Sequence, residues 1–140
     1  RVVEVPVSIG GRRWDITCVS MGNPHAVVFV DDADSLDLEK TGPQFEHNRI
    51  FPERINTEFV QVIDGSTLKM RVWERGSGET LACGTGACAS LVAATLTGRC
   101  AGRAKVLVRG GELEIEWDQA ENKVYMTGPA AAVFEGEFYI

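Results

Sequence analysis

The stretch GTGACASLVAATLT at residues 84–97 decides the fold of this chain. It carries no charged side chain and is rich in alanine and aliphatic residues, which is typical of a helix that is buried on all sides. Gly98 and Arg99 supply the stop signal that follows it. Such a helix must be surrounded by protein, and its small side chains let neighbouring backbone approach closely. We therefore expect the rest of the chain to wrap around it.

Most of the remaining sequence is strand-like. Strands are expected at residues 2–8, 13–21, 26–30, 55–63, 68–73, 106–108, 113–117, 123–126 and 132–139. Glycine-rich and Asp-Gly turns between them predict two hairpins and a final meander. Residues 36–47 have helix-like spacing, but Gly42-Pro43 predicts a broken helix, because proline lacks an N–H and clashes with the preceding turn. The expected fold is α+β, a β-rich, barrel-like domain wrapped around a central buried helix.

Length and charge limit the possible partners. The chain has 140 residues, which is one domain's worth of sequence, and 44% of them are hydrophobic, as in ordinary globular proteins. Its 14 Lys and Arg against 20 Asp and Glu give a net charge of −6. Nucleic acid and anionic membranes need a basic surface, so we expect neither as a partner. The apolar stretches are also shorter than the ~20 residues of a membrane-spanning helix. A small molecule or a protein is the expected partner.

Cysteine usage indicates the compartment. The four cysteines form no Cys-x-x-Cys pair and are too sparse for a disulfide-stapled secreted scaffold. We expect a reducing, cytoplasmic location, or a plastid if the source is a plant.

The sequence ERGSGETLACGTG at residues 74–86 delivers Cys83 to the start of the predicted helix. Unpaired N–H groups and the dipole at a helix N-terminus favour anions, so the pKa of this thiol is expected to lie below its usual ~8.5. Gly84 and Gly86 keep side chains away, which leaves backbone N–H groups free to bind a carboxylate or phosphate. The pattern predicts that Cys83 is a proton carrier beside an anion-binding site.

A simpler interpretation is that Cys83 is a small buried hydrophobic residue, which is the usual fate of a free cysteine. The adjacent Gly-Thr-Gly, the helix start and the charged pair Glu74-Arg75 favour function instead. Cys88 lies inside the helix and is predicted to be a core residue, as are Cys18 and Cys100.

Cofactors and metals are not expected. Residues 84–89 fit the dinucleotide pattern Gly-x-Gly-x-x-Gly/Ala, but that motif needs a parallel strand after the helix and an acidic residue ~20 positions on. The first acidic residue after Glu79 is Glu112, in an apparent meander. No lysine stands beside a phosphate-binding loop, so pyridoxal phosphate is not indicated. The two histidines lack the carboxylate spacing of a metal site.

Two further spots are ambiguous when each is taken alone. Asn23 and His25 lie in a Gly-Asn-Pro-His turn before an apolar run, and Asn56 precedes an apolar strand. Each is a plausible turn residue. Together with residues 74–89, however, residues 22–25, 51–56 and 125–130 form four separated motifs in order.

With these motifs the chain resembles, over nearly its whole length, the carboxy-terminal half of the diaminopimelate epimerases. These are cofactor-independent enzymes of lysine and peptidoglycan-precursor synthesis. Proline racemases and isomerases related to phenazine biosynthesis share the fold, but Glu-Arg-Gly-x-Gly-Glu-Thr at residues 74–80 points to the diaminopimelate enzymes.

The resemblance implies two pseudo-symmetric halves with substrate between their two helix N-termini, and a homodimer in the full-length enzyme. It makes Cys83 one of two catalytic cysteines, of which one removes the α-proton while the other reprotonates the opposite face. Catalytic roles are implied for Cys83, Glu74 and His25. Substrate binding is implied for Asn23, Asn56, Glu74, Arg75 and the N–H groups of Gly84 and Thr85.

The amino-terminal half of that family, with the partner cysteine, is absent from these residues. We therefore expect residues 1–140 to be a carboxy-terminal domain that starts inside a longer protein, and to be catalytically inactive alone. Three alternatives stay open: a related racemase or isomerase of the same fold, a cysteine nucleophile with His25 as its base, and a non-catalytic amino-acid-binding module.

Overall fold

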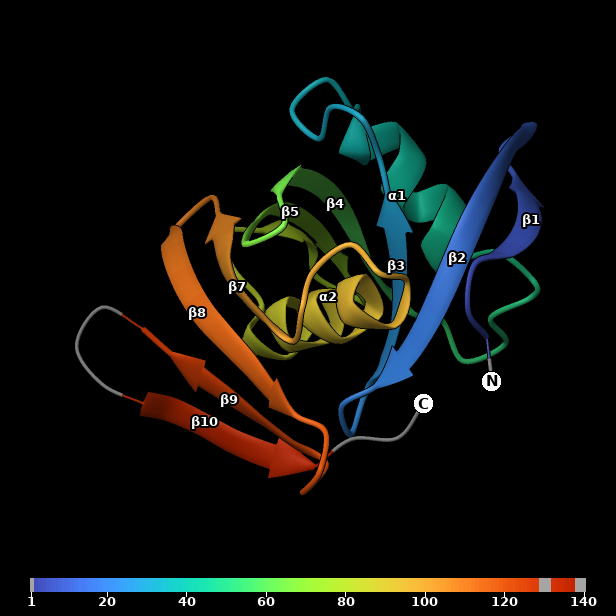
Figure 1. Cartoon of the computed structure of the whole chain (residues 1–140). Coiled ribbons are helices and arrows are strands. Elements are labelled where there is room, and N and C mark those ends of the chain that lie inside the picture. The colour runs from blue at the N-terminus through green and yellow to red at the C-terminus, as the bar shows by residue number, and fades with distance from the viewer. Residues whose placement is uncertain (1, 129–131, 138–140) are drawn as a thin grey trace.

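A computed structural model describes residues 2–128 and 132–137, and within them one curved sheet and two helices (Figure 1). The helices are α1 (Leu38–Glu46) and α2 (Gly84–Leu96). The strands are β1 (Val5–Ile9), β2 (Arg12–Ser20), β3 (Pro24–Phe29), β4 (Asn56–Asp64), β5 (Thr67–Glu74), β6 (Gly78–Thr80), β7 (Arg103–Val108), β8 (Gly111–Asp118), β9 (Lys123–Thr127) and β10 (Ala132–Glu137).

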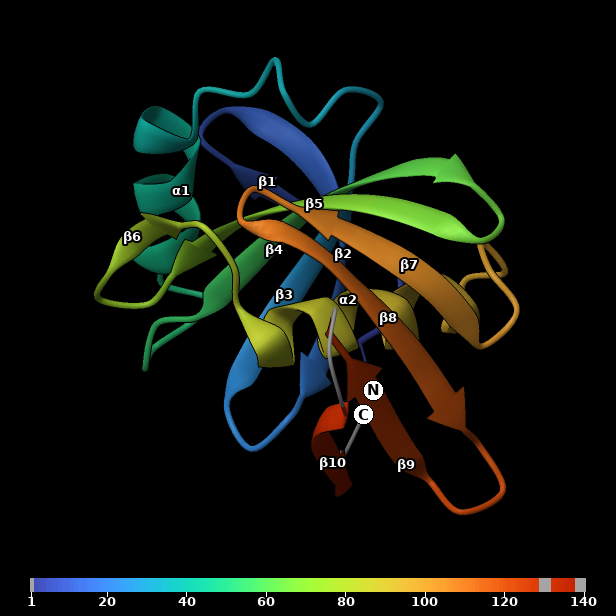
Figure 2. The same cartoon turned by 90° about the vertical axis from the view of Figure 1, so that its left-hand side faces the viewer.

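The strand order is β1-β2-β3-β4-β5-β7-β8-β9-β10, and β6 pairs with β5 beside this path. Neighbouring strands are antiparallel except for β3 with β4 and β5 with β7, which are parallel. The sheet curls around α2, which contacts β2, β3, β4, β5, β7, β8 and β9 (Figures 1 and 2). The α+β class and the buried helix are thus confirmed. Among the described residues the path stays open between β1 and β10, so closure into a barrel is not confirmed.

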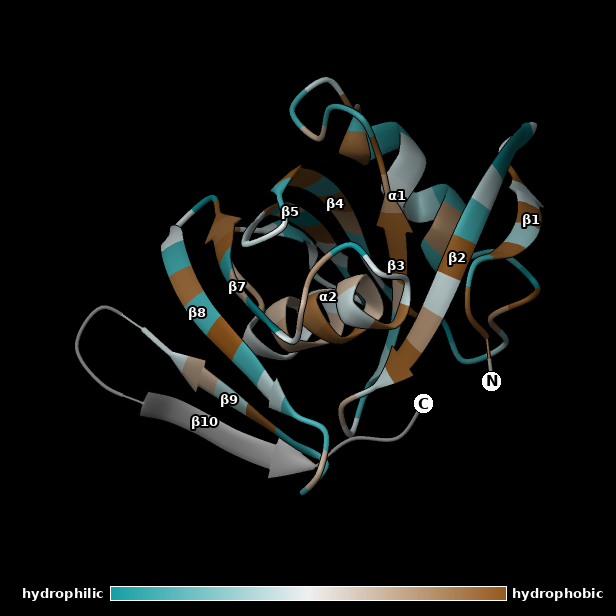
Figure 3. Ribbon diagram, viewed as in Figure 1, coloured by the Kyte–Doolittle hydropathy of each residue, from teal (hydrophilic) through white to brown (hydrophobic). Residues whose placement is uncertain are grey.

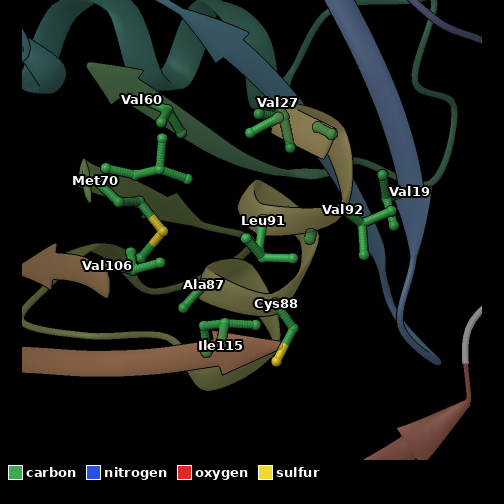
Figure 4. Packing of buried hydrophobic residues seen from close by; sticks show 14 of the residues in the cluster. Val19, Val27, Val60, Met70, Ala87, Cys88, Leu91, Val92, Val106 and Ile115 are labelled. Atoms are coloured by element: carbon green, nitrogen blue, oxygen red, sulfur yellow. The ribbon is translucent and has the colours of Figure 1, made fainter. Parts of the chain in front are cut away.

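Helix α2 is buried over nearly its whole length, as its uncharged sequence predicts. Residues 86–94 are all buried, and the predicted range of 84–97 differs from the observed one by a single residue. Leu91 and Val92 pack against Val19, Val27 and residues of the neighbouring strands in one core cluster (Figure 4). A charged side chain anywhere in this segment would need a partner in that apolar core.

The central strands are buried on both faces, because α1 covers the face opposite α2. Val27 and Val60 belong to the cluster around α2, whereas their neighbours Val28 and Phe59 belong to a second cluster with α1. This is the two-residue alternation of a β-strand. In the second cluster the rings of Phe45 and Phe59 are T-shaped, with centroids 5.3 Å apart.

Helix α1 is continuous, so the prediction that Gly42-Pro43 breaks it is wrong. A residue before proline is pushed out of the helical region partly through its Cβ, which glycine lacks. Gly42 is also required by packing: a Cβ there would lie 2.2 Å from Cδ2 of the Trp73 indole. The Gly-Pro pair therefore allows a close contact between α1 and β5 and does not end the helix.

Other boundaries differ in instructive ways. Strand β6 was not predicted, because three residues of Gly-Glu-Thr show no apolar alternation. Strand β7 follows α2 and is parallel to β5, so the sheet does contain the parallel strand that the dinucleotide motif needs after its helix. The absence of an early acidic residue still speaks against the dinucleotide motif. Residues 138–139 of the last predicted strand and residues 129–130 of the fourth motif lie outside the described residues.

Strand β8 shows where the sheet meets solvent. Hydrophilic and hydrophobic residues alternate along it (Figure 3), with Glu114 and Glu116 exposed and Ile115 buried between them.

In residues 2–128 and 132–137, neither helix combines the length and the apolar character needed to cross a bilayer.

Candidate functional site

Polar side chains gather at one end of three neighbouring central strands, β3, β4 and β5. The parallel strands β3 and β4 begin there, and β5, antiparallel to β4, ends there. His25 pairs with Asn56 in the register of β3 and β4, and Glu58 follows Asn56 at the two-residue spacing of one strand face. That face is the one covered by α2, since Val60 lies two residues further on in the cluster around the helix. The strands thus direct these polar groups towards α2.

Cys83 is the N-cap residue of α2. Its backbone is extended, with φ −136° and ψ 111°, and its sulfur accepts a hydrogen bond from Gly86 N at 3.3 Å. Thr85 Oγ1 lies 3.6 Å from the same sulfur. The N–H groups of Gly84 and Thr85 belong to the first turn, where no earlier carbonyl of the helix can accept them. The half-buried thiol therefore lies among donors suited to an anion.

The pKa of Cys83 is raised, so the prediction of a lowered pKa is wrong. Burial of the thiol is the largest cause, and hydrogen bonds from Thr85 and Gly86 oppose it. The negative charges of Glu58 and Glu74 raise the pKa further. The sequence identified the helix terminus correctly, but it could not show how much water the fold removes from the sulfur.

His25 lies behind the thiol and is only 1% exposed. Its Nδ1 is 2.6 Å from Glu58 Oε1, and its Nε2 is 3.1 Å from both Asn23 Oδ1 and Thr85 Oγ1. The predicted site residues Asn23, His25 and Thr85 are thus brought together in one hydrogen-bonded group. The imidazole approaches Cys83 through the hydroxyl of Thr85.

Glu58 is a member of this group that sequence reasoning missed. Its side chain is fully buried, and burial raises the pKa of its carboxyl although His25 lowers it. The available signal was a charged residue within the apolar strand 55–63, two positions after Asn56 and hence on the same face.

Asn56 joins two of the sequence motifs. Its Nδ2 donates to the carbonyl of Pro24 at 2.9 Å, and its Oδ1 accepts from the backbone N–H of Arg75 at 2.8 Å. The side chain is thereby tied to the turn that carries Asn23 and to the loop that follows β5. Asn56 fixes the relative position of the two segments, while its contact with a substrate stays a prediction.

Glu74 and Arg75 have separate partners and do not act as a charged pair. Thr80 Oγ1 donates to the carboxylate of Glu74, whereas the Arg75 guanidinium donates to the carbonyl of Glu53 at 3.3 Å. Arg75 is exposed and Glu74 is half-buried, so the arginine side chain is open to solvent at the rim of the site.

The other three cysteines are free, and no hydrogen bond joins them to this group among the described residues. Cys88 is buried in the core of α2, as predicted, and burial raises its pKa to about 12. Cys18 and Cys100 are half-buried beside the two core clusters. Among the described residues, no group of three His, Cys, Asp or Glu side chains is arranged to hold a metal ion.

Solved structures define the fold class. The chain is similar to a phenazine biosynthesis protein of the PhzF family from Enterococcus faecalis, with a TM-score of 0.61 and 16% identity over 81% of this chain and 43% of that protein. A putative PhzC/PhzF protein from Clostridium difficile gives a TM-score of 0.61 and 20% identity over 83% and 44%. At these identities the likeness concerns the fold alone.

Sequence comparison then identifies the family. The diaminopimelate epimerase family model matches residues 17–133. The chain is 63% identical to the diaminopimelate epimerase of Acetivibrio thermocellus over 94% of its own length and 47% of that enzyme. It is 58% identical to that of Nostoc punctiforme over 98% and 49%. This chain belongs to the diaminopimelate epimerase family, and it spans about half the length of the curated relatives it matches.

Proposed function

We propose that this chain supplies one half of the active site of a cofactor-independent epimerase that interconverts LL- and meso-diaminopimelate. In this proposal Cys83 exchanges a proton with the α-carbon on one face, and a second cysteine on the amino-terminal half acts on the other face. The observation that carries the proposal is the position of Cys83, a half-buried thiol at the N-terminus of α2 beside a polar cluster in a chain of this family.

The chemistry needs stabilisation of a carbanion, because the α-proton of an amino acid is only weakly acidic. The first-turn N–H groups of Gly84 and Thr85 would bind the carboxylate attached to the reacting carbon. The guanidinium of Arg75 is suited to forked pairing with the distant carboxylate. Asn23 and Asn56 would hold the ends of the substrate. No cofactor is required in this scheme.

A raised pKa suits a residue that must deliver a proton. Since burial favours the neutral form of Cys83, the resting group is a thiol, which can reprotonate the carbanion. In the reverse direction the thiolate, supported by Thr85 and Gly86, would remove the proton. Glu74 and His25 would adjust the balance between these states.

Deuterium incorporation at the α-carbon of diaminopimelate in D2O tests this function, in the intact protein from which the chain derives. The control is the Cys83→Ala variant. We expect uptake in the unsubstituted protein and its reduction in the variant by about 10²–10⁴-fold, which is the usual contribution of a general acid–base group. Unchanged uptake in the variant would reject Cys83 as the proton carrier.

The same incubation separates the alternatives. A cysteine nucleophile predicts a covalent adduct, seen as a mass increase on the peptide that contains Cys83. A binding module predicts that Cys83→Ala preserves function while Arg75→Ala abolishes it. The 140-residue chain alone is expected to give no exchange, because one face of the substrate would lack both its proton donor and its wall.

The proposal extends to the assembly and location of the complete enzyme. We expect a homodimer of two-halved subunits in a reducing cytoplasm. Light scattering of the complete enzyme should give twice the subunit mass, and a mass of one subunit at high concentration would count against this.

A further inference from the structure

Four side chains form a continuous path that ends at the sulfur of Cys83. Glu58 Oε1 is 2.6 Å from His25 Nδ1, and His25 Nε2 is 3.1 Å from Thr85 Oγ1. Thr85 Oγ1 is in turn 3.6 Å from Cys83 Sγ. The side chains of Glu58 and His25 are fully buried, so water does not compete for the contact between them. The path joins β4, β3 and the first turn of α2.

The acceptors around His25 set the direction of the hydrogen bonds. A carboxylate faces Nδ1 and the amide oxygen of Asn23 faces Nε2 at 3.1 Å, so both ring nitrogens have a group that accepts an N–H. When both ring nitrogens carry a proton, Nε2–H donates to Thr85 Oγ1 as well as to Asn23 Oδ1. The hydroxyl proton of Thr85 is then directed to Cys83 Sγ, which also accepts from Gly86 N.

We propose that Glu58 is a positioning residue, which holds the His25 ring so that Nε2–H donates to Thr85 and the Thr85 hydroxyl donates to the sulfur of Cys83. This inference deepens the proposed function and rests on it, because a sulfur that receives two donors is prepared for its thiolate state during proton transfer. Glu58 acts through His25 and Thr85 and does not itself touch the reacting atoms.

Stability alone does not account for a carboxylate at this position. Glu58 Oε2 is buried without a hydrogen-bond partner among the described residues, and such a group costs free energy. The fold nevertheless leaves room for it: a Cβ on Gly86 would lie 2.7 Å from Glu58 Oε1 and 3.2 Å from Cys83 Sγ. The absence of a side chain at Gly86 thus permits the Glu58 carboxylate to lie close to the thiol of Cys83.

The test is a double-mutant cycle on the reactivity of Cys83 in the full 140-residue chain. The alkylation rate with iodoacetamide near neutral pH is measured for each cysteine by mass spectrometry, because the thiolate is the reacting form. The variants are Glu58→Gln, Thr85→Val and the double variant. Cys88 is the internal control for opening of the core, since it is fully buried.

Glu58→Gln is expected to slow Cys83 about tenfold, equivalent to one pKa unit. In the proposal the Glu58 carboxylate balances a ring that carries two protons. A neutral amide does not, so the ring keeps its proton on Nδ1, and the bare Nε2 takes the Thr85 proton away from the sulfur. Thr85→Val is expected to slow Cys83 similarly, and adding Glu58→Gln to it should change nothing, because Glu58 acts through Thr85. Removal of the Glu58 charge alone would do the opposite and speed alkylation, since that charge raises the pKa of Cys83. Faster alkylation in Glu58→Gln, or additive slowing in the double variant, would overturn the proposal.

A spectroscopic measurement on the unsubstituted chain guards against misfolding of the variants. The chain has two histidines, His25 and His47. The ¹⁵N signals that persist in the His47→Gln variant therefore belong to the His25 ring. A proton on Nε2 is expected, and a bare Nε2 would overturn the proposal. Neither readout requires epimerase activity. A failed deuterium exchange would therefore reject the proposed function, whereas the role of Glu58 stands or falls on the alkylation rates and the ring signals.

Discussion

Two buried glutamates, Glu46 and Glu58, lie on opposite faces of the sheet and differ in how completely they are hydrogen-bonded. Glu46, on α1, is 4% exposed, and its two oxygens accept from Trp73 Nε1 at 2.9 Å and from Gly76 N at 3.0 Å. Glu58, beneath α2, is hydrogen-bonded to His25 through one oxygen, and its second oxygen has no hydrogen-bond partner among the described residues. Both carboxylates are buried, but only Glu46 is fully hydrogen-bonded.

The pKa values of the two groups move in opposite directions. Burial alone raises the pKa of Glu46, but the hydrogen bonds from Trp73 and Gly76, together with the neighbouring His47 and Arg54, outweigh it and leave the pKa lowered. Burial dominates at Glu58 and raises its pKa. Glu46 therefore supports structure by fixing the loop at Gly76 against β5 and α1. Glu58 is kept in a costly environment beside the candidate site, which is where proteins retain such groups for function.

The largest expected effect on stability comes from Gly42→Ala, which disturbs the packing of α1 against Trp73 near Glu46. The new Cβ would lie 2.2 Å from the indole of Trp73, a rigid ring that also donates to Glu46. We expect the free energy of unfolding to fall by about 2–3 kcal/mol, as for other overpacked cores. Urea denaturation measures this. Alkylation of Cys83 in the folded variant should stay unchanged, and a large change would mean that the two regions are coupled.

The matching substitution on the Glu58 side is Gly86→Ala. Its Cβ would meet Glu58 Oε1 and the sulfur of Cys83, which are ends of side chains and can shift. A stability loss of about 1 kcal/mol is expected, because overpacking is partly offset by the better helix propensity of alanine. Alkylation of Cys83 should change several-fold. If Gly86→Ala lost as much stability as Gly42→Ala while the alkylation rate of Cys83 stayed unchanged, the expected link between Gly86 and the reactivity of Cys83 would be wrong.

The smallest expected effects concern how the stabilities contributed by Glu46 and Glu58 depend on pH. Folding lowers the pKa of Glu46, so its ionised form stabilises the fold above its unfolded pKa of ~4.3, and this contribution is lost as pH falls through the folded pKa. Folding raises the pKa of Glu58, so its stabilising contribution is present at acid pH and is lost as pH rises from ~4.3 through the folded pKa.

Unfolding free energies of Glu46→Gln and Glu58→Gln should therefore differ from the unsubstituted chain with opposite pH dependence. The deficit of Glu46→Gln, about 1 kcal/mol, should shrink towards acid pH, whereas that of Glu58→Gln should grow. Parallel pH dependence in the two variants would show that the environments are equivalent.

The sequence predicted those features that depend on local pattern. The uncharged run at residues 84–97 identified α2 almost to the residue, and the helix start placed Cys83 correctly. Asn23, His25 and Thr85 were proposed from their motifs and do meet in one hydrogen-bonded group. Their roles towards substrate remain predictions.

Features that depend on contacts between distant segments were missed. Glu58 gains its meaning only when β4 pairs in parallel with β3 and brings it to His25, 33 residues away. The raised pKa of Cys83 depends on burial in the folded chain, which no local motif reports. The continuity of α1 through Pro43 likewise depends on the glycine that lets Trp73 pack against it.

Protection of Cys83 by diaminopimelate tests the central claim most directly, because it asks whether substrate reaches this thiol. Iodoacetamide alkylation of each cysteine is followed in the intact protein with and without diaminopimelate, and half-buried Cys100 is the internal reference. We predict that diaminopimelate slows alkylation of Cys83 and leaves that of Cys100 unchanged. Equal rates at Cys83 with and without saturating diaminopimelate would contradict the placement of the active site at the N-terminus of α2.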